Sequence, residues 1–363
     1  MKTPNILSAP DRRADQRGFS LIEIMVGVVI GMIAVLVIYQ VFAAAEGIKR
    51  NTTSAGDAQQ NGLLASFMLG VELANASNGV AMAWQKLQSC PTTANAATTL
   101  RPIPILITAG AGPTFPDQFV VNYSISNLAI APAPFKAASG SNAPYTVHAP
   151  IGFRVGDIVV AISGGSPGAG TCATSRVTAV SAPTPGPPDE SAGQVTISHT
   201  NAPFAFTDDA FLLNMGAASN VQRVLYDVGA NGVLHSTSLW DSNGAAAAAP
   251  VPNPLASNIV NMKLLYGIDN NGDGFLDTWV APTGAWSNAS VLAADASTLR
   301  KIKAVRLGII VQGEQWDRDA PDVTAHLFDD AIPFSQAFLR SGGGNYRYRW
   351  YETVIPMRNS VWN

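Results

Sequence analysis

The stretch RGFSLIEIMVGVVI, residues 17–30, opens the apolar part of the chain and carries one carboxylate, Glu23. From Ile24 to Ala45 the sequence is apolar except for Tyr39 and Gln40. As a helix, this run of about 22 residues rises about 33 Å, which is long enough to cross the hydrocarbon core of a membrane. The basic residues of the preceding segment favour a cytoplasmic N-terminus.

Three interpretations of this segment compete. A cleaved secretory signal has a small-residue site at residues 43–45, but the apolar run is too long for such a signal. A plain membrane anchor explains the length, and Glu23 then lies close enough to the cytoplasmic end to reach the headgroups. A third interpretation uses the glutamate itself and rests on residues 17–23.

The string RGFSLIE at residues 17–23 resembles the type IV prepilin signature: a basic leader, Gly, Phe, a small polar residue, two aliphatic residues and Glu. The resemblance implies that a membrane aspartyl peptidase cuts between Gly18 and Phe19 and methylates the new Phe19 amine. That cationic amine lies four residues before Glu23. In a filament core, the amine and the carboxylate of neighbouring subunits can pair, and a buried charge is tolerable only when paired.

The resemblance also predicts the architecture. We expect an α+β, pilin-like fold, in which a long N-terminal α-helix packs on an antiparallel β-sheet-rich globular domain and its membrane half protrudes. Leu64, Phe67, Met68 and Val71 follow helical spacing, which predicts that the helix continues to about Asn75 and docks this face on the domain. The expected parts are a leader (1–18), a transmembrane and filament-core helix (19–45), an amphipathic continuation (46–75) and a β-rich periplasmic or extracellular domain (76–363).

Several later segments have strand patterns. Alternation predicts strands at 153–162, 259–268 and 302–312, and Val221–Leu234 predicts a hairpin with Asn231-Gly232 in its turn. The stretch 244–254, GAAAAAPVPNP, is typical of a linker.

The chain closes with YRYRWYETVIPMRN, residues 346–359. Its alternation predicts a half-exposed strand. Interleaved arginines and aromatic residues are also typical of single-stranded nucleic-acid binding. The balanced net charge of -3 favours the strand, and we expect no nucleic-acid partner.

The composition gives little support to catalysis. The chain has only four histidines, and it shows neither a nucleophile motif nor zinc-ligand spacing, which argues against an enzyme. Its two cysteines, Cys90 and Cys172, follow a segment that sends them across the inner membrane, where thiols oxidise. We predict a disulfide between them; the alternative is two unpaired buried thiols.

An acidic loop, DNNGDGFLD at residues 269–277, follows the pattern of a calcium-binding loop. Its oxygen side chains fall at loop positions one, three, five and nine, and Gly274 supplies the sharp turn. Val280 stands where such loops usually have a glutamate. The alternative is a tight turn between strands, but the nearby carboxylates need a counter-ion, which favours calcium. The predicted ligands are Asp269, Asn271, Asp273, Asp277 and the carbonyl of Phe275.

The ending TVIPMRN (353–359), the hairpin around Tyr226, the strand with GDIVV and the acidic loop resemble PilW-like minor pilins. This resemblance implies a minor subunit of a type IV pilus that acts in a priming and tip complex. The implied partners are other minor pilins, the major pilin, the prepilin peptidase and a large tip adhesin. The chain would cross the inner membrane once, among its lipids, before assembly into the extracellular pilus.

Two alternatives share much of this pattern. A minor pseudopilin of a type II secretion system has the same leader, helix and hairpin, and only the C-terminal resemblance argues against it. A major pilin is disfavoured because the bulk subunits of this family are usually much smaller than 363 residues.

Overall fold

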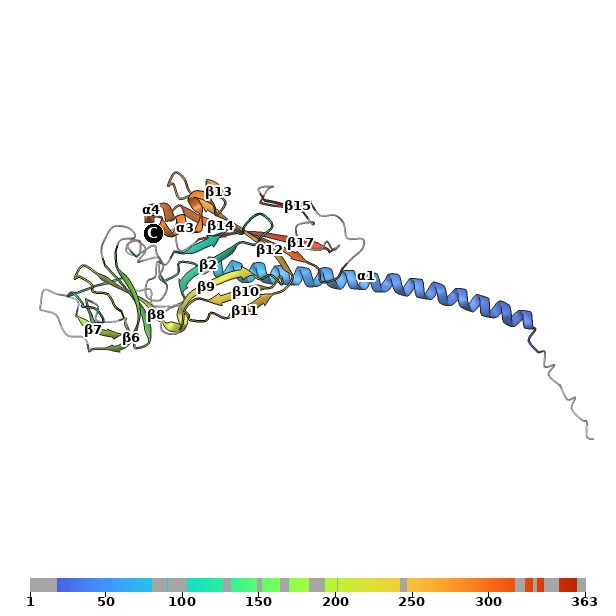
Figure 1. Ribbon diagram of the computed structural model, residues 1–363, viewed down its shortest axis with the longest axis horizontal. Coiled ribbons are helices and arrows are strands. Elements are labelled where there is room, and N and C mark those ends of the chain that lie inside the picture. Colours follow the sequence, from blue (N-terminus) through green and yellow to red (C-terminus); the bar gives the residue numbers. More distant parts are fainter. Residues whose placement is uncertain are drawn as a thin grey trace, which may run out of the picture. The chain divides into compact units, whose positions relative to one another are not determined.

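The computed structural model describes most of the chain between Gly18 and Met357 (Figure 1). The described residues are 18–79, 90, 103–126, 132–148, 152–163, 170–182, 193–200, 202–241, 247–316, 324–328, 332–335 and 346–357. The chain divides into two compact units, Met1–Thr53 and Ser54–Asn363. The predicted leader lies outside the described residues except for Gly18.

One long helix, α1 (Leu21–Asn75), begins the described chain. No proline interrupts its 55 residues. It ends where Ser77 and Gly79 take φ angles of 70° and 73°, the left-handed conformation that commonly follows a helix. The predicted helix and its end at Asn75 are therefore confirmed.

The first sheet has five antiparallel strands in the order β1-β2-β9-β10-β11. They are β1 (Ile105–Thr108), β2 (Gln118–Ser124), β9 (Val221–Val228), β10 (Leu234–Ser238) and β11 (Pro252–Ala256). β9 and β10 form the predicted hairpin, and Gly232 in its turn has φ of 73°. The linker predicted at 244–254 is wrong at its end, because β11 begins at Pro252. The prolines are tolerated there because β11 is an edge strand.

The second sheet has four antiparallel strands in the order β13-β12-β14-β17. They are β12 (Ile259–Ile268), β13 (Thr278–Val280), β14 (Ile302–Gln312) and β17 (Tyr348–Pro356). The strands predicted at 259–268 and 302–312 are confirmed, as is a strand in the C-terminal stretch. Between β13 and β14 lie η3 (Gly284–Trp286), α3 (Asn288–Ala293) and α4 (Ala296–Leu299). Between β14 and β17, β15 (Thr324–Leu327) pairs with β16 (Ile332–Ser335).

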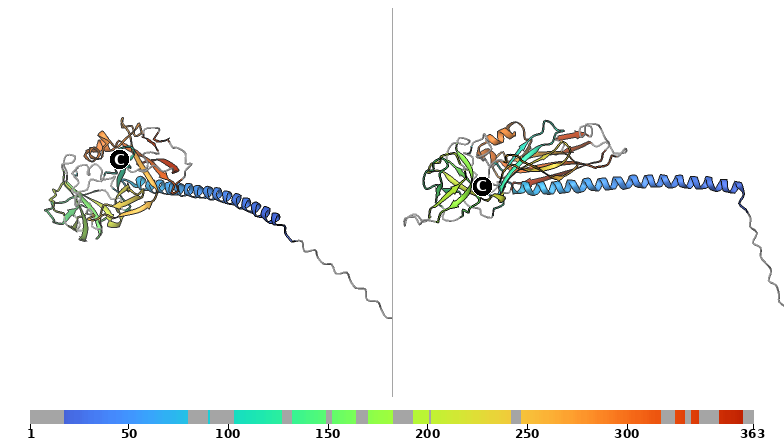
Figure 2. Two further views of the ribbon diagram at one scale, coloured as in Figure 1. Left: turned by 45° about the vertical axis from the view of Figure 1, so that its right-hand side comes forward. Right: turned by 60° about the horizontal axis from the view of Figure 1, so that its bottom comes forward.

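Between β2 and β9, which are neighbours in the first sheet, the chain inserts a further module. Its strands, in the order β3-β8-β5-β6-β7-β4, appear together as a green group in both views of Figure 2. Phe135, Tyr145 and Phe206 pack in a core of its own. The elements are β3 (Ala133–Pro134), β4 (Tyr145–Val147), β5 (Asp157–Ile162), β6 (Cys172–Val180), β7 (Val195–His199), β8 (Phe211–Ala217) and η2 (Ala218–Asn220).

The strand predicted at 153–162 begins later than expected, at Asp157. Gly156 has φ of 95°, which interrupts the extended backbone before it. The buried Asp157 carboxylate accepts the Arg154 backbone N–H at 2.9 Å and the Asn214 amide at 2.9 Å. The turn and its carboxylate therefore fix where β5 starts.

The part of α1 from Ser54 onward packs against both large sheets within the second unit. Its buried face consists mostly of small residues, which allow the sheets to approach closely. The docking face predicted from helical spacing is wrong, because the side chains of Leu64, Phe67 and Val71 are 44%, 71% and 44% exposed. The residues buried instead are Ser54, Ala58, Gly62, Ala65, Leu69 and Leu73.

The fold class is confirmed: a long N-terminal α-helix and a globular unit rich in antiparallel sheet. The functional division into leader, membrane helix, continuation and domain stays a prediction, as does the protruding membrane half.

Candidate processing and assembly site

The predicted cleavage site lies just before α1. Gly18, Phe19 and Ser20 are outside the helix, and their side chains and backbone are exposed. The helix begins as the backbone N–H groups of Glu23 and Ile24 donate to the Ser20 carbonyl at 3.0 and 3.2 Å. A non-helical, accessible bond is what a peptidase can extend in its active site. The Gly18–Phe19 bond is therefore exposed and lies outside the helix.

Glu23 lies in the first turn of α1. A carboxylate is favourable there because the helix dipole leaves partial positive charge at the N-terminus. Ser20 and Glu23 also have the S-x-x-E spacing of a capping box. In the part of the chain that the structure describes, no hydrogen bond or ion pair holds the Glu23 carboxylate. It is therefore available to a cationic group from another chain.

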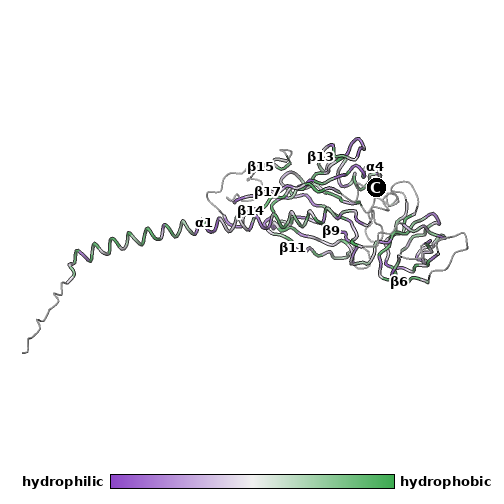
Figure 3. Tube along the Cα trace, turned by 180° about the vertical axis from the view of Figure 1, so that it is seen from behind, coloured by the Kyte–Doolittle hydropathy of each residue, from purple (hydrophilic) through white to green (hydrophobic). Residues whose placement is uncertain are grey.

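The first half of α1 is apolar on all sides. It is the one helix among the described residues that is long and apolar enough to cross a membrane, by length and composition. Figure 3 shows the change from a hydrophobic to a hydrophilic stretch along α1. Side chains as large as Ile30 and Phe42 are 62% and 71% exposed. Such a surface needs lipid or other apolar side chains around it.

A carboxylate of α1 is held by tyrosines of the first sheet. The Tyr123 hydroxyl donates to the Glu72 carboxylate at 2.6 Å. Burial raises the pKa of Tyr123 far above its usual value, and the hydrogen bond to Glu72 and the charge of Glu72 raise it further. The pKa of Tyr226 is raised for the same reasons, first burial and then the charge of Glu72. Tyr226 also stacks on Phe119, with ring centroids 5.1 Å apart. This polar contact fixes how α1 is turned on the sheet.

The C-terminal strand β17 contacts α1 through Tyr351. Its hydroxyl donates to the Gln59 carbonyl at 3.4 Å, and its ring lies directly against Gly62. Ile355, on the same side of β17, is buried in the core that includes α1, whereas Trp350 and Val354 on the opposite side are exposed. The alternation of the closing stretch therefore reflects a strand with one covered side.

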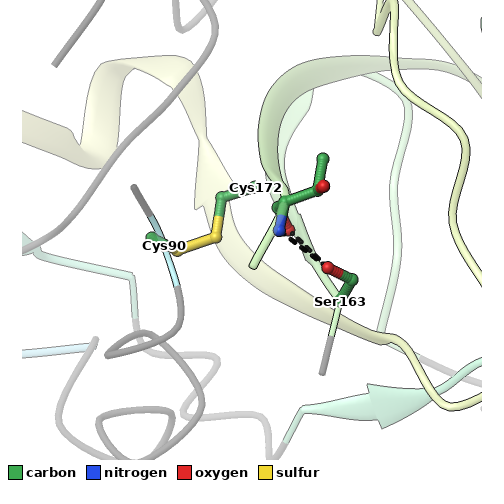
Figure 4. The surroundings of a disulfide bond; sticks show 4 residues. Cys90, Ser163 and Cys172 are labelled. Atoms are coloured by element: carbon green, nitrogen blue, oxygen red, sulfur yellow. Dashed lines mark hydrogen bonds between the residues drawn. A yellow bond between two sulfur atoms is a disulfide. The ribbon is translucent and has the colours of Figure 1, made fainter. Parts of the chain in front are cut away.

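The predicted disulfide joins Cys90 and Cys172, with their Cα atoms 5.2 Å apart (Figure 4). Both cysteines are fully buried. Cys172 begins β6, and the preceding Thr171 N–H donates to the Ser163 hydroxyl at 2.7 Å. The bond therefore ties the segment after α1 to the inserted module.

The acidic loop runs between β12 and β13 and begins with a buried carboxylate. Asp269 accepts the N–H groups of Gly272 and Gly274 at 2.6 and 2.9 Å, and the Lys303 ammonium lies 3.7 Å away. Burial raises the pKa of Asp269, but the two N–H groups and the Lys303 charge outweigh it and hold that pKa below its usual value. Sequence reasoning missed Lys303, since only the pairing of β12 with β14 brings it here.

The other predicted calcium ligands are held by short hydrogen bonds within the loop. Asn271 accepts the Asp273 N–H at 2.9 Å, and Asp273 accepts the Phe275 N–H at 2.8 Å. Asp277 accepts the Asn270 N–H at 2.7 Å. The structure thus brings the ligands into one tight turn. Within the described residues, no group of three or more His, Cys, Asp or Glu side chains is arranged to hold a metal ion.

Two parts of the chain match known family models. Residues 13–39 match the prokaryotic N-terminal methylation motif, and residues 225–359 match type IV pilus-assembly protein W. Among solved structures, a type IV-like pilin from Thermus thermophilus shares 15% identity over 58% of this chain and 89% of that chain. The TM-score of the superposition is 0.24. No curated protein matches the sequence.

These matches confirm the resemblance seen at both ends of the chain. The match to the methylation motif covers Gly18, Phe19 and Glu23. The match to the pilus-assembly protein covers strand β10 of the β9–β10 hairpin and all four strands of the second sheet. The inserted module lies outside both. The prepilin motif and the apolar helix fit membrane anchoring before pilus assembly.

Proposed function

We propose that this type IV pilin-like protein is a minor subunit of a type IV pilus, processed by prepilin peptidase and incorporated in the priming and tip complex. The start of α1 carries the proposal: an accessible Gly18–Phe19 bond directly before a helix whose first turn bears an unpaired Glu23. The two family matches support it, since one covers this motif and the other is described as a pilus-assembly protein.

The mechanism is assembly. Hydrolysis of the Gly18–Phe19 bond leaves a leader carboxylate and a new amine on Phe19, which the peptidase methylates. The helix anchors the subunit in the inner membrane, with its N-terminus in the cytoplasm, until the pilus machinery extracts it. In the filament, the Phe19 amine and Glu23 of adjacent subunits pair, which offsets the cost of burying each charge.

The partners follow from this role. They are the prepilin peptidase, the major pilin, other minor pilins and a large tip adhesin. The match over residues 225–359 favours a pilus subunit over the minor pseudopilin alternative. The final location is the periplasm and the extracellular pilus.

The test replaces Glu23. We expect Glu23→Ala and Glu23→Gln to leave cleavage intact, seen as a methylated Phe19 N-terminus by mass spectrometry, and to abolish recovery of the chain in sheared pili. The control is Glu46→Ala, which removes an exposed glutamate of the same helix that pairs with Arg50. Normal incorporation of Glu23→Ala would overturn the proposal.

For the acidic loop we propose a structural calcium ion, as the sequence predicts. The proposal is supported by the single loop that gathers the oxygen ligands. The Lys303 ammonium, 3.7 Å from the Asp269 carboxylate, would compete with the ion for that charge. Calorimetry on the full-length chain in detergent should show heat on calcium addition, lost in Asp273→Ala and kept in Asp208→Ala, an exposed control. Absence of heat and of any thermal shift would reject the ion.

A further inference from the structure

A cavity of about 720 Å³ lies in the second unit, where the ends of the two large sheets meet. Its walls come from the β1–β2 loop, the turn of the β9–β10 hairpin, the start of β12 and the end of β14. This volume falls within the range of about 300–1,000 Å³ that is typical of small-molecule sites. None of these segments takes part in the processing site or in the acidic loop described above.

Hydrogen bonds tie the walls of the cavity to β12. The Gly232 carbonyl, in the hairpin turn, accepts the Ile259 N–H at 2.9 Å. The Asp117 N–H, at the end of the β1–β2 loop, donates to the Met262 carbonyl at 2.8 Å. The end of β14 is held by its pairing with β12. The fold itself therefore forms the cavity, as is usual for small-molecule sites.

A buried ion pair holds the β1–β2 loop in place. The Lys263 ammonium donates to the Asp117 carboxylate at 2.8 Å and to the Gly112 carbonyl at 3.1 Å. The same carboxylate accepts the N–H groups of Gly110 and Leu264 at 2.9 and 3.0 Å. Burying two charges is costly even when they are paired, so such a pair is better explained by the conformation that it fixes than by added stability. Here it fixes the conformation of the loop.

The fixed loop presents an aromatic side chain to the cavity. Phe115 lines the cavity, and its N–H donates to the Gly112 carbonyl at 3.1 Å within a turn. The loop is so tightly folded that a Cβ atom at Gly110 would overlap the carbonyls of Phe115 and Pro116. The Phe115 ring is nevertheless 56% exposed. A ring that is held in advance loses little freedom when a ligand packs on it, which favours binding.

The polar side chains of the lining are neutral. They include the amides of Gln118, Asn231, Asn258 and Gln312, and none of the described residues that line the cavity is charged. In the described part of the chain, the amides of Gln118, Asn258 and Gln312 make no hydrogen bond. Each amide offers a carbonyl acceptor and two N–H donors, which match hydroxyl groups that both donate and accept. A charged ligand would lose its water here without gaining a counter-ion.

A peptide fits the cavity less well. Peptides often bind by adding a strand to the free edge of a sheet. Among the described strands of the walls, β2, β9, β12 and β14 already have partners on both sides. Thr108, at the end of the edge strand β1, is held by the Asn288 amide at 2.6 Å. The alanines and glycines of the lining also give a helix few large apolar side chains to pack on.

We propose that this cavity binds a neutral carbohydrate. The apolar C–H face of a sugar ring packs on Phe115, and the hydroxyl groups of the sugar bond to the amides of Gln118 and Gln312. This inference goes beyond the proposed function and does not rest on it, because the cavity belongs to the globular unit alone. The glycan comes from the cell's own envelope or from a surface that the cell contacts, and both present the same hydroxyl chemistry.

The test is binding of defined glycans to the purified full-length chain. The detergent must lack a sugar headgroup, because maltosides and glucosides would compete for the cavity. An array carries neutral oligosaccharides, their sialylated forms and muramic-acid-containing cell-wall fragments, and calorimetry then measures the affinity of the neutral oligosaccharide that binds best. We expect neutral oligosaccharides to bind and sialic acid to add no affinity. Binding of the cell-wall fragments or of the other glycans distinguishes the two sources.

Substitutions locate the binding in the cavity. Phe115→Ala and Gln118→Ala should each weaken it at least about tenfold, because each removes a direct contact with the sugar. Phe115→Trp should keep it, because an aromatic face remains. The matched control is Phe67→Ala, which removes a 71% exposed ring outside the cavity and should leave the affinity unchanged. Thermal unfolding verifies that the variants stay folded, as expected for exposed positions.

Several outcomes overturn the inference. They are binding of no neutral glycan, binding that requires a charged sugar, or unchanged affinity in both Phe115→Ala and Gln118→Ala. Another is crosslinking in cells: if p-benzoylphenylalanine in place of Phe115 captures mainly another polypeptide, the cavity is a protein interface. Normal pilus assembly by Glu23→Ala would overturn the proposed function and leave the glycan result untouched, so the two proposals fail separately.

Discussion

At the scale of single residues, Gly62 decides how closely α1 approaches the second sheet. A Cβ atom there would overlap the ring of Tyr351, whereas a Cβ at Gly70 would meet no atom within 4 Å. We predict that Gly62→Ala lowers the free energy of unfolding by about 1–3 kcal/mol, because the ring or the helix must move. Urea unfolding of the full-length chain in detergent measures this.

The matched control is Gly70→Ala, which should raise that free energy by up to about 1 kcal/mol because alanine is the better helix former. Tyr351→Ala removes the ring that a Cβ atom at position 62 would overlap. Gly62→Ala should therefore lower the free energy of unfolding less in the Tyr351→Ala variant than in the unaltered chain. A neutral Gly62→Ala would contradict the close approach of helix and ring.

Asp269 gives the acidic loop a dependence on pH. Its carboxyl has a pKa below the ordinary value of 3.8, so its charged form stabilises the folded loop at neutral pH. As the pH falls below that value, the unfolded chain binds a proton first, and this stabilisation is lost through the lower pKa of the folded state. We predict that the difference in stability between the unaltered chain and Asp269→Asn is constant near neutral pH and shrinks below about pH 4.

Denaturation across pH 2–7, with Asp208→Asn as the exposed control, measures the difference. A difference that stays the same into strong acid would show that the charge of Asp269 contributes nothing to the folded loop.

At the scale of elements, the disulfide connects the segment after α1 to strand β6 across 82 residues of sequence. We predict that Cys90→Ser with Cys172→Ser lowers the free energy of unfolding by about 4–5 kcal/mol, because the unfolded chain is no longer cross-linked over a long loop. Reductant should have the same effect on the unaltered chain and none on the double variant. Equal unfolding curves with and without reductant would contradict the bridge.

Elements with a strong local signal could be predicted from the sequence. The long helix, β12, β14 and the β9–β10 hairpin each have a periodic pattern and a clear end. Of the inserted module only β5 could be predicted: β3 and β4 have two and three residues, and they pair with β8 and β7, which are distant in sequence. The prediction of which face of α1 packs on the sheets was also wrong. Helical spacing identifies an apolar side, but the sheets approach so closely that small residues such as Ala58 and Gly62 form the buried face instead.

The residues of the candidate sites also fall into those that a local motif identifies and those that only the fold brings together. Gly18, Phe19 and Glu23 form a local motif, so the sequence alone identifies them. Lys303 beside Asp269, and Tyr351 against Gly62, depend on strand pairing and helix docking. A single sequence carries no signal for either contact.

At the scale of the whole molecule, the proposed role makes a prediction about abundance. Quantitative mass spectrometry of sheared pili should find this chain at a small fraction of the major subunit, because a priming and tip complex holds few copies. A ratio near one would contradict the minor-subunit role and would make this chain the bulk subunit of its filament.

The inserted module also has a consequence for the order of folding. Ser124 of β2 pairs with Val221 of β9, yet roughly a hundred residues separate them. Closing so long a loop in an unfolded chain is entropically costly, whereas a module that has already folded presents its two ends side by side. We therefore expect the insertion to fold before the sheet that it interrupts, so that changes in its core slow the refolding of the first sheet.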